Sequence, residues 1–267
     1  MAYITEIDQI IDSVYPEQIN LKSFETKDVL NYKIWSDNDL KKPIRKRLYN
    51  IATEFIDNVD LPGIVISDIV LVGSIAGFNW SKFSDIDLHI IIDMDKLAEK
   101  YGSKEVIKKL FDDERNLFNK KHNDLYIYGY PVELYVQDIN EENASNGIYS
   151  ILNGRWIKVP QGGNRLTNKN LIKKKAAQFI NIIDKYAEIA NRKLSEAQYI
   201  LLKDRLDKIH DEIITGRRTS LAKDGEYASD NIVFKVLRRS GHLGILNDAR
   251  TLVYDKLNSI KTKHIKR

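Results

Sequence analysis

Cysteine is absent from the 267-residue sequence. This absence excludes disulfide bonds, thiolate nucleophiles and zinc sites with cysteine ligands, so any metal has to bind oxygen or histidine. Long apolar runs are missing too: no stretch approaches the roughly 20 residues that cross a bilayer, and the amino terminus carries early acidic residues instead of an apolar leader. We therefore expect a cytoplasmic protein without a membrane segment, and hard cations as the natural metals.

The charge is small overall but unevenly distributed. The net charge is +4, yet residues 165–267 hold 23 Lys and Arg against 12 Asp and Glu, a balance of +11, whereas residues 1–164 hold 19 against 26, a balance of −7. A basic carboxyl-terminal part suggests a phosphate-rich partner. Solvated faces of lysine-rich helices explain the same counts, so the sequence leaves both interpretations open.

The first 160 residues alternate between helical and strand patterns. Apolar residues recur at helical spacing over 43–60, and β-branched runs at 66–72 and 86–92 predict two strands separated by a turn. Ser103 is a plausible cap for a helix to about Lys121, and strand-like residues 125–137 are broken at Gly129-Tyr130-Pro131. This order predicts a mixed sheet flanked by helices.

The pattern becomes purely helical after the Gln161-Gly162-Gly163-Asn164 stretch, which is the best linker candidate in the chain. Helices are expected over 169–192, over 195–215 with Ser195 as cap, and over 230–240 with Ser229 as cap and Gly241 as terminator. Residues 261–267 are expected to be a frayed tail. The predicted architecture is an α/β (α+β) domain at 1–160 followed by an all-helical domain at 165–267.

Two carboxylates interrupt the apolar run of the second predicted strand. Residues two apart in a strand point to the same side, so Asp85 and Asp87 share one face. Neighbouring carboxylates repel each other unless a cation neutralises them. Magnesium prefers oxygen ligands and commonly binds one or two carboxylates together with substrate phosphates, so these aspartates are candidate metal ligands.

Gly73-Ser74 follows the preceding strand directly. A glycine at such a turn lets the backbone approach a phosphate, and a serine hydroxyl can hydrogen-bond one of its oxygens. Lys82 and Ser84 lie just before the aspartates and are weaker candidates for contacts with a triphosphate, Lys82 as a point charge and Ser84 through its hydroxyl.

Gly73-Ser74, ten intervening residues and then Asp85-Ile86-Asp87-Leu88 resemble the signature of the DNA polymerase β-like nucleotidyltransferase superfamily. Glu133 matches the position of that superfamily's third carboxylate, on a later strand of the same sheet. The resemblance implies that Asp85 and Asp87 hold two magnesium or manganese ions. It also implies that Glu133 joins them in positioning and activating an attacking hydroxyl, as a nucleoside monophosphate moves from a triphosphate such as ATP and pyrophosphate leaves.

Within the superfamily the chain is most similar to the small stand-alone nucleotidyltransferases of tailed bacteriophages, through the stretches 79–82, 149–153 and 155–158. This similarity implies residence in the cytoplasm of an infected bacterium. The acceptor could be an RNA end, a protein side chain, a small molecule such as an aminoglycoside, or a second nucleotide, and the basic carboxyl-terminal part slightly favours RNA. The alternatives are an antitoxin-like enzyme that transfers AMP to a protein, and a non-catalytic nucleotide-binding or structural protein with the same fold.

Two other residue sets compete for a place in the site. Asp93-Met94-Asp95 repeats the acidic spacing, but it lies where a strand ends and a helix cap is expected. His89 shares the face of the aspartates and could touch a phosphate or metal-bound water, although a hydrogen-bonded core histidine is the commoner arrangement.

Aromatic and basic residues carry weaker signals. Trp80, Trp156 and Tyr149 could stack on a base, but core packing explains each of them better. Lys235, Arg238 and Arg239 form a basic stripe opposite four apolar residues, Ile232, Val233, Val236 and Leu237. The stripe could contact RNA or a triphosphate, and an ordinary solvated face explains it equally well.

Overall fold

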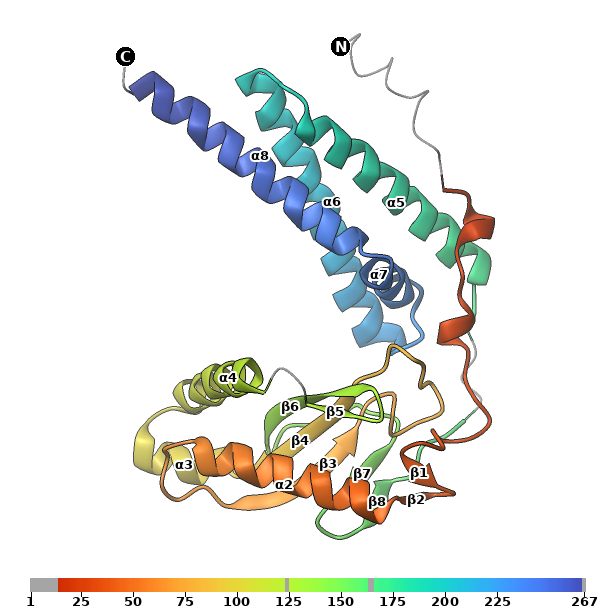
Figure 1. Ribbon diagram of the computed structural model, residues 1–267, viewed down its shortest axis with the longest axis vertical. Helices are drawn as coiled ribbons and strands as arrows, with labels where there is room; N and C mark the ends of the chain where they lie inside the picture. Colours follow the sequence, from red (N-terminus) through yellow and green to blue (C-terminus); the bar gives the residue numbers. More distant parts are fainter. Residues whose placement is uncertain (1–13, 123–124, 163–165, 266–267) are drawn as a thin grey trace. The chain divides into compact units, whose positions relative to one another are not determined.

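The computed structural model describes residues 14–122, 125–162 and 166–265, and it divides into two compact units (Figure 1). One unit is formed by residues 23–164, and the other combines the described residues 14–22 and 166–265. The predicted domains, 1–160 and 165–267, differ from this division in the amino-terminal segment. Val14 N donates to Asn181 Oδ1 at 2.8 Å and Asn181 Nδ2 donates to Val14 O at 3.0 Å, which ties residue 14 to the helical unit.

The 23–164 unit contains a two-stranded and a six-stranded sheet together with three α-helices. The strands are β1 (Trp35–Ser36), β2 (Asp39–Leu40), β3 (Ile66–Val72), β4 (Ile86–Ile92), β5 (Tyr126–Ile127), β6 (Tyr130–Asp138), β7 (Ile148–Ser150) and β8 (Arg155–Lys158). The helices are α2 (Lys42–Asn58), α3 (Met94–Tyr101) and α4 (Lys104–Lys121). Short 3-10 helices cover Pro16–Gln18, which belongs to the other unit, and Lys22–Phe24, which spans the division.

The six-stranded sheet is mixed, with the order β5-β6-β4-β3-β7-β8. Only β4 and β6 run parallel, and the other neighbouring strands are antiparallel. The two predicted strands 66–72 and 86–92 are confirmed as β3 and β4, as is the mixed α/β class. Helix α3 was given no predicted range, although a helix cap was expected at Asp93. Strands β7 and β8, of three and four residues, are too short to show a clear alternating pattern.

Strand β4 separates a closed face of the sheet from a partly open one. Ile86, Leu88, Ile90 and Ile92 are fully buried and share one core with the apolar side of helix α2. The alternate residues Asp87, His89 and Ile91 on the other face are only half-buried. Ile91, the middle one of three consecutive isoleucines, also keeps partial exposure on this face. The face of β4 that carries Asp87 and His89 is therefore partly accessible to solvent.

A tight turn separates β5 from β6. Tyr128 and Gly129 both adopt positive φ angles, 51° and 86°, as expected for a two-residue hairpin loop whose twist matches the flanking strands. The predicted break in the 125–137 strand is therefore confirmed. It allows β6 to return beside β4 and place Glu133 next to Asp87.

The helical unit consists of α5 (Lys169–Asn191), α6 (Glu196–Asp224), α7 (Ser229–Arg239) and α8 (His242–Ile265). Ser195 caps α6, as predicted, with its Oγ accepting from Gln198 N at 3.3 Å. The cap prediction for α7 was wrong: Ala228 occupies the N-cap position and Ser229 is the first helical residue. The expected frayed tail is also corrected, because α8 continues to Ile265, and residues 266–267 lie outside the described residues.

The helices of this unit bury amphipathic faces against one another. The apolar side of α7, formed by Ile232, Val233, Val236 and Leu237, is buried as predicted. In the part of the chain that the structure describes, no helix is both long enough and apolar enough to cross a bilayer.

Candidate metal centre

Three carboxylates meet at one end of the six-stranded sheet. Asp85 immediately precedes β4, Asp87 is its second residue, and Glu133 on the parallel strand β6 is the register partner of Asp87. Each residue offers a carboxylate oxygen, and these oxygens all lie within 4.8 Å of one another. Asp85 and Asp87 are half-buried while Glu133 is exposed. The three predicted ligands are thus brought together by strand register.

The turn after β3 is shaped around Asp87. Val72 is paired with Asp87 across β3 and β4, and Gly73 follows with φ +74°. A Cβ atom at Gly73 would lie only 1.7 Å from Asp87 Oδ2. No side chain can occupy that position while Asp87 keeps its place, so glycine is required both for the backbone conformation and for the approach of the carboxylate.

Two serines connect this turn to the segment before β4. Ser74 Oγ donates to Ser84 Oγ at 2.7 Å, and Ser84 Oγ also accepts from Ser81 N at 3.0 Å. Ser84 is 5% exposed, whereas Ser74 is partly exposed. Of the two serines predicted to contact a phosphate, Ser74 is therefore the more accessible. Ser84 is buried and accepts the hydrogen bond of Ser74.

Lys82 is exposed, and its Nζ lies 5.0 Å from the centre of the Phe83 ring. None of the described contacts of Lys82 reaches the three carboxylates. The contact of Lys82 with a triphosphate therefore stays a prediction.

The carboxylate cluster suits a hard divalent cation. It supplies only oxygen ligands, and three carboxylates with oxygens within 4.8 Å of one another repel each other unless a cation neutralises them. Gly73 lacks a side chain, so the Asp87 carboxylate lies directly against the backbone of the turn. The residues present therefore fit magnesium or manganese.

The competing pair Asp93 and Asp95 has a structural role, as its position predicted. Asp93 is the N-cap of α3, and its Oδ1 accepts from Lys96 N at 3.2 Å, a bond that holds the pKa of Asp93 below its usual value. Asp95 forms an ion pair with Lys104 at 2.7 Å. Both carboxylates are thus engaged within this helical corner.

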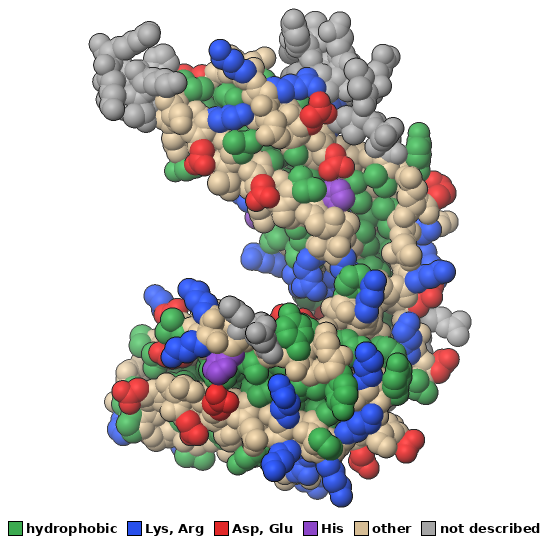
Figure 2. Space-filling model, in the orientation of Figure 1, with side chains coloured by type: hydrophobic (Ala, Val, Ile, Leu, Met, Phe, Trp, Pro, Cys, Tyr) green, Lys and Arg blue, Asp and Glu red, His purple; other side chains and the backbone are tan. Residues whose placement is uncertain are grey.

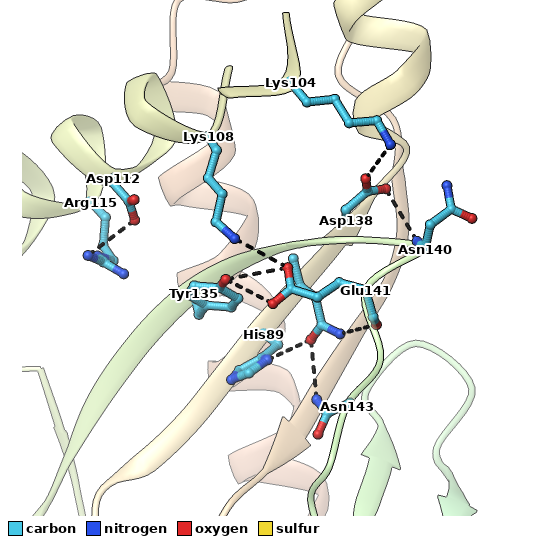
Figure 3. Close-up of polar contacts among 11 residues, drawn as sticks. His89, Lys104, Lys108, Asp112, Arg115, Tyr135, Asp138, Asn140, Glu141 and Asn143 are labelled. Atoms are coloured by element: carbon cyan, nitrogen blue, oxygen red, sulfur yellow. Dashed lines mark hydrogen bonds and ion pairs between the residues drawn. The ribbon is translucent and has the colours of Figure 1, made fainter. Parts of the chain in front are cut away.

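His89 belongs to a hydrogen-bonded network on the same face of the sheet (Figure 3). Its Nδ1 lies 2.8 Å from Gln137 Oε1, and its ring centre lies 5.0 Å from that of Tyr135. Tyr135 OH donates to Glu141 at 3.1 Å. Burial lowers the pKa of His89, although the hydrogen bond with Gln137 opposes the shift. The expectation of a hydrogen-bonded histidine is confirmed.

Sequence reasoning missed Tyr135 and Gln137 as members of this network. A signal was available: they follow Glu133 by two and four residues, so strand alternation places them on its face. The contribution of Asn143 could not be predicted, because it depends on how residues 139–146 fold back toward Gln137.

The three aromatic candidates pack within the fold. Trp156 stacks on Trp35 with ring centres 4.7 Å apart, and Tyr149 meets both rings edge-on. Trp80 is partly exposed, and its Nε1 donates to Val29 O at 2.9 Å. Core packing therefore accounts for Tyr149 and Trp156, and a backbone contact holds Trp80.

The basic stripe of α7 is only partly solvated. Lys235 forms an ion pair with Glu226, Arg238 is exposed, and Arg239 is half-buried. Arg217 of α6 lies over the Phe234 ring at 4.1 Å, and Lys and Arg side chains gather on this part of the helical unit (Figure 2). Arg238 is thus exposed to solvent, whereas the charge of Lys235 is already paired with the Glu226 carboxylate.

Comparisons with protein-family models, with curated proteins and with solved structures gave no match. The functional proposal therefore depends on the motif, the strand register and the geometry of the carboxylates.

Proposed function

We propose that the protein is a magnesium-dependent nucleotidyltransferase, with manganese as the alternative metal, and that residues 23–164 form a DNA polymerase β-like catalytic domain. One observation carries the proposal: carboxylate oxygens of Asp85, Asp87 and Glu133 lie within 4.8 Å of one another. They do so beside a glycine-serine turn at the end of the adjacent strand.

In the proposed reaction the acceptor oxygen forms a bond to the α-phosphorus of the triphosphate, and the bond from that phosphorus to the bridging oxygen breaks. Pyrophosphate leaves, and the acceptor hydroxyl would give up its proton to the Glu133 carboxylate, which the resemblance assigns to activation of that hydroxyl. Bound magnesium would supply charge stabilisation to the attacking and leaving oxygens. Asp85, Asp87 and Glu133 would hold the metal, and Glu133, the exposed member, would also orient the acceptor hydroxyl.

The turn supplies the phosphate seat in this proposal. Gly73 places no side chain between its backbone and a phosphate, and the partly exposed Ser74 hydroxyl can donate to a phosphate oxygen if it releases Ser84. Ser84 then remains bonded to Ser81 N, so the turn keeps its shape. ATP serves as the reference donor.

We propose an RNA end as the acceptor because residues 165–267 carry a balance of +11. Transfer of AMP to a protein is the rival outcome. Pyrophosphate release from each of the four ribonucleoside triphosphates, with and without total RNA, tests both. Release that requires Asp87 and rises with RNA supports the proposal.

Labelled ATP added to a bacterial lysate then distinguishes the acceptors, because label enters RNA in one case and protein in the other. Asp87→Asn is the control variant in each reaction. Full magnesium-dependent turnover by that variant would show that the proposed centre is wrong. Absence of release from all four triphosphates under every condition would favour a non-catalytic nucleotide-binding protein.

A further inference from the structure

The hydrogen-bond directions around His89 determine which ring nitrogen carries its proton (Figure 3). Ser145 N donates to Asn143 Oδ1 at 3.0 Å, so Asn143 offers Nδ2, which donates to Gln137 Oε1 at 3.2 Å. Gln137 Nε2 donates to the backbone carbonyl of Glu141 at 2.8 Å. A carbonyl only accepts, so Gln137 has to turn its oxygen toward His89. The Nδ1 atom of His89 is therefore the donor in the 2.8 Å contact.

The other nitrogen, Nε2, consequently keeps its lone pair when the ring is neutral. The hydrogen bond that the structure describes for the His89 ring is at Nδ1, and in Figure 3 the second nitrogen points away from Asn143 and the rest of the network. His89 thus presents a fixed hydrogen-bond acceptor on a partly open surface.

The acceptor atom lies on the face that carries the carboxylates. His89 follows Asp87 by two residues, about 6–7 Å along a strand, and its register partner Tyr135 follows Glu133 by two. Side chains from these positions can reach different atoms of one sugar ring. A lone pair recognises a hydrogen-bond donor, and above neutral pH a phosphodiester oxygen offers none, whereas a hydroxyl does.

We propose that His89 Nε2 accepts a hydrogen bond from the terminal 2′-hydroxyl of an RNA acceptor, while the adjacent 3′-hydroxyl lies at Asp85, Asp87 and Glu133. This inference rests on the proposed nucleotidyl transfer. It makes His89 the residue that selects ribose over deoxyribose ends, since the 2′-hydroxyl is the group that distinguishes RNA from DNA.

The test compares two oligonucleotides of one sequence that end in ribose or in 2′-deoxyribose, at pH 8. Burial lowers the pKa of His89 and so favours its neutral ring. The wild-type kcat/KM should favour the ribose end about tenfold, the effect of one hydrogen bond of about 1.4 kcal/mol. His89→Asn keeps a donor toward Gln137 but lacks Nε2, so the ratio of its rates on the ribose and deoxyribose ends should fall to about one.

His89→Gln places an amide oxygen near the former Nε2 position and should restore part of the preference. A purely structural role for His89 would lower both rates together and leave the ratio unchanged, and that result would overturn the inference. Asp87-dependent transfer to either end would still support the proposed function. If neither end accepts a nucleotide, the result contradicts both the proposed RNA acceptor and the proposed role of His89.

A second measurement does not require turnover. Long-range ¹H–¹⁵N spectra of protein with labelled histidine, assigned by the signal missing from His89→Asn, should show a protonated Nδ1 and an unprotonated Nε2 at pH 8. A proton on Nε2 would overturn the inference whatever the kinetics show.

Discussion

At the residue scale, Gly73 is the position with the least tolerance for a side chain. Its φ of +74° strains any other residue, and an added Cβ would lie 1.7 Å from Asp87 Oδ2. Gly129 has a similar φ of +86°, but the space around it is open. Substitutions at these two glycines therefore distinguish the effect of backbone strain from the effect of displacing the Asp87 carboxylate.

We expect Gly73→Ala and Gly129→Ala each to lose about 1–3 kcal/mol of stability from the positive φ, measured by urea unfolding. Gly73→Ala should lose more, because Asp87 also has to move. Turnover should fall at least tenfold in Gly73→Ala only, as pyrophosphate release would show. An equal loss of turnover in Gly129→Ala would mean that general destabilisation, and not the position of Asp87, limits activity.

The sequence predicted which carboxylates come together better than it predicted the polar contacts around them. Strand alternation placed Asp85 and Asp87 on one face, and the resemblance added Glu133, which the parallel register then brings to Asp87. The link from His89 through Gln137 to Asn143 could not be predicted. It depends on the path of a loop, and local residue patterns do not encode such a path.

At the element scale, Lys104 connects three segments. Its Nζ lies 2.7 Å from Asp95 on α3 and 2.9 Å from Asp138 at the end of β6, while Lys104 itself begins α4. Burial alone would raise the pKa of Asp138, but the hydrogen bond and charge of Lys104, together with hydrogen bonds from the backbone of Asn140 and Met94, lower that pKa. The lysine thus holds the end of β6 close to both helices.

Lys104→Met should lower the urea midpoint at pH 7. A carboxyl with a lowered folded-state pKa stabilises the fold above its ordinary pKa of about 4 and loses this effect as the pH falls through the folded-state value. The difference between Lys104→Met and wild type should therefore shrink from pH 5 downward. Lys96→Met, which removes a partner of Asp93 at 3.3 Å, is the surface control and should change little. A difference that persists unchanged at pH 3 would contradict this role.

Long periodic or β-branched segments were the predictable elements, and weak or interrupted patterns were not. Strands β3 and β4 match their predicted ranges because each is a seven-residue segment rich in β-branched residues, although Asp68, Asp87 and His89 interrupt the apolar pattern. Helix α8 was missed although Leu246, Ala249, Val253 and Leu257 are buried at helical spacing. Glycines 241 and 244 at its start and the basic residues near its end obscured that period.

At the scale of the whole molecule, the two units differ in both architecture and charge. The 23–164 unit holds the sheet and the carboxylates, whereas the other unit is helical in its described part and includes residues 14–22. Each unit has its own buried core. Independent cores give independent unfolding transitions unless an interface couples them.

Calorimetry should therefore resolve two transitions, and magnesium should raise only the one that belongs to the 23–164 unit. A ligand that binds the folded state stabilises it by about 2.7 kcal/mol at one hundred times its Kd. Asp87→Asn should abolish this shift and raise the same transition slightly without metal, because one of three repelling carboxylates is neutralised. Calcium is a useful second probe, since it prefers the same oxygen ligands. If magnesium raises the transition temperature of Asp87→Asn as much as that of wild type, the metal binds elsewhere. A single transition that the substitution does not change would show that the two cores unfold together.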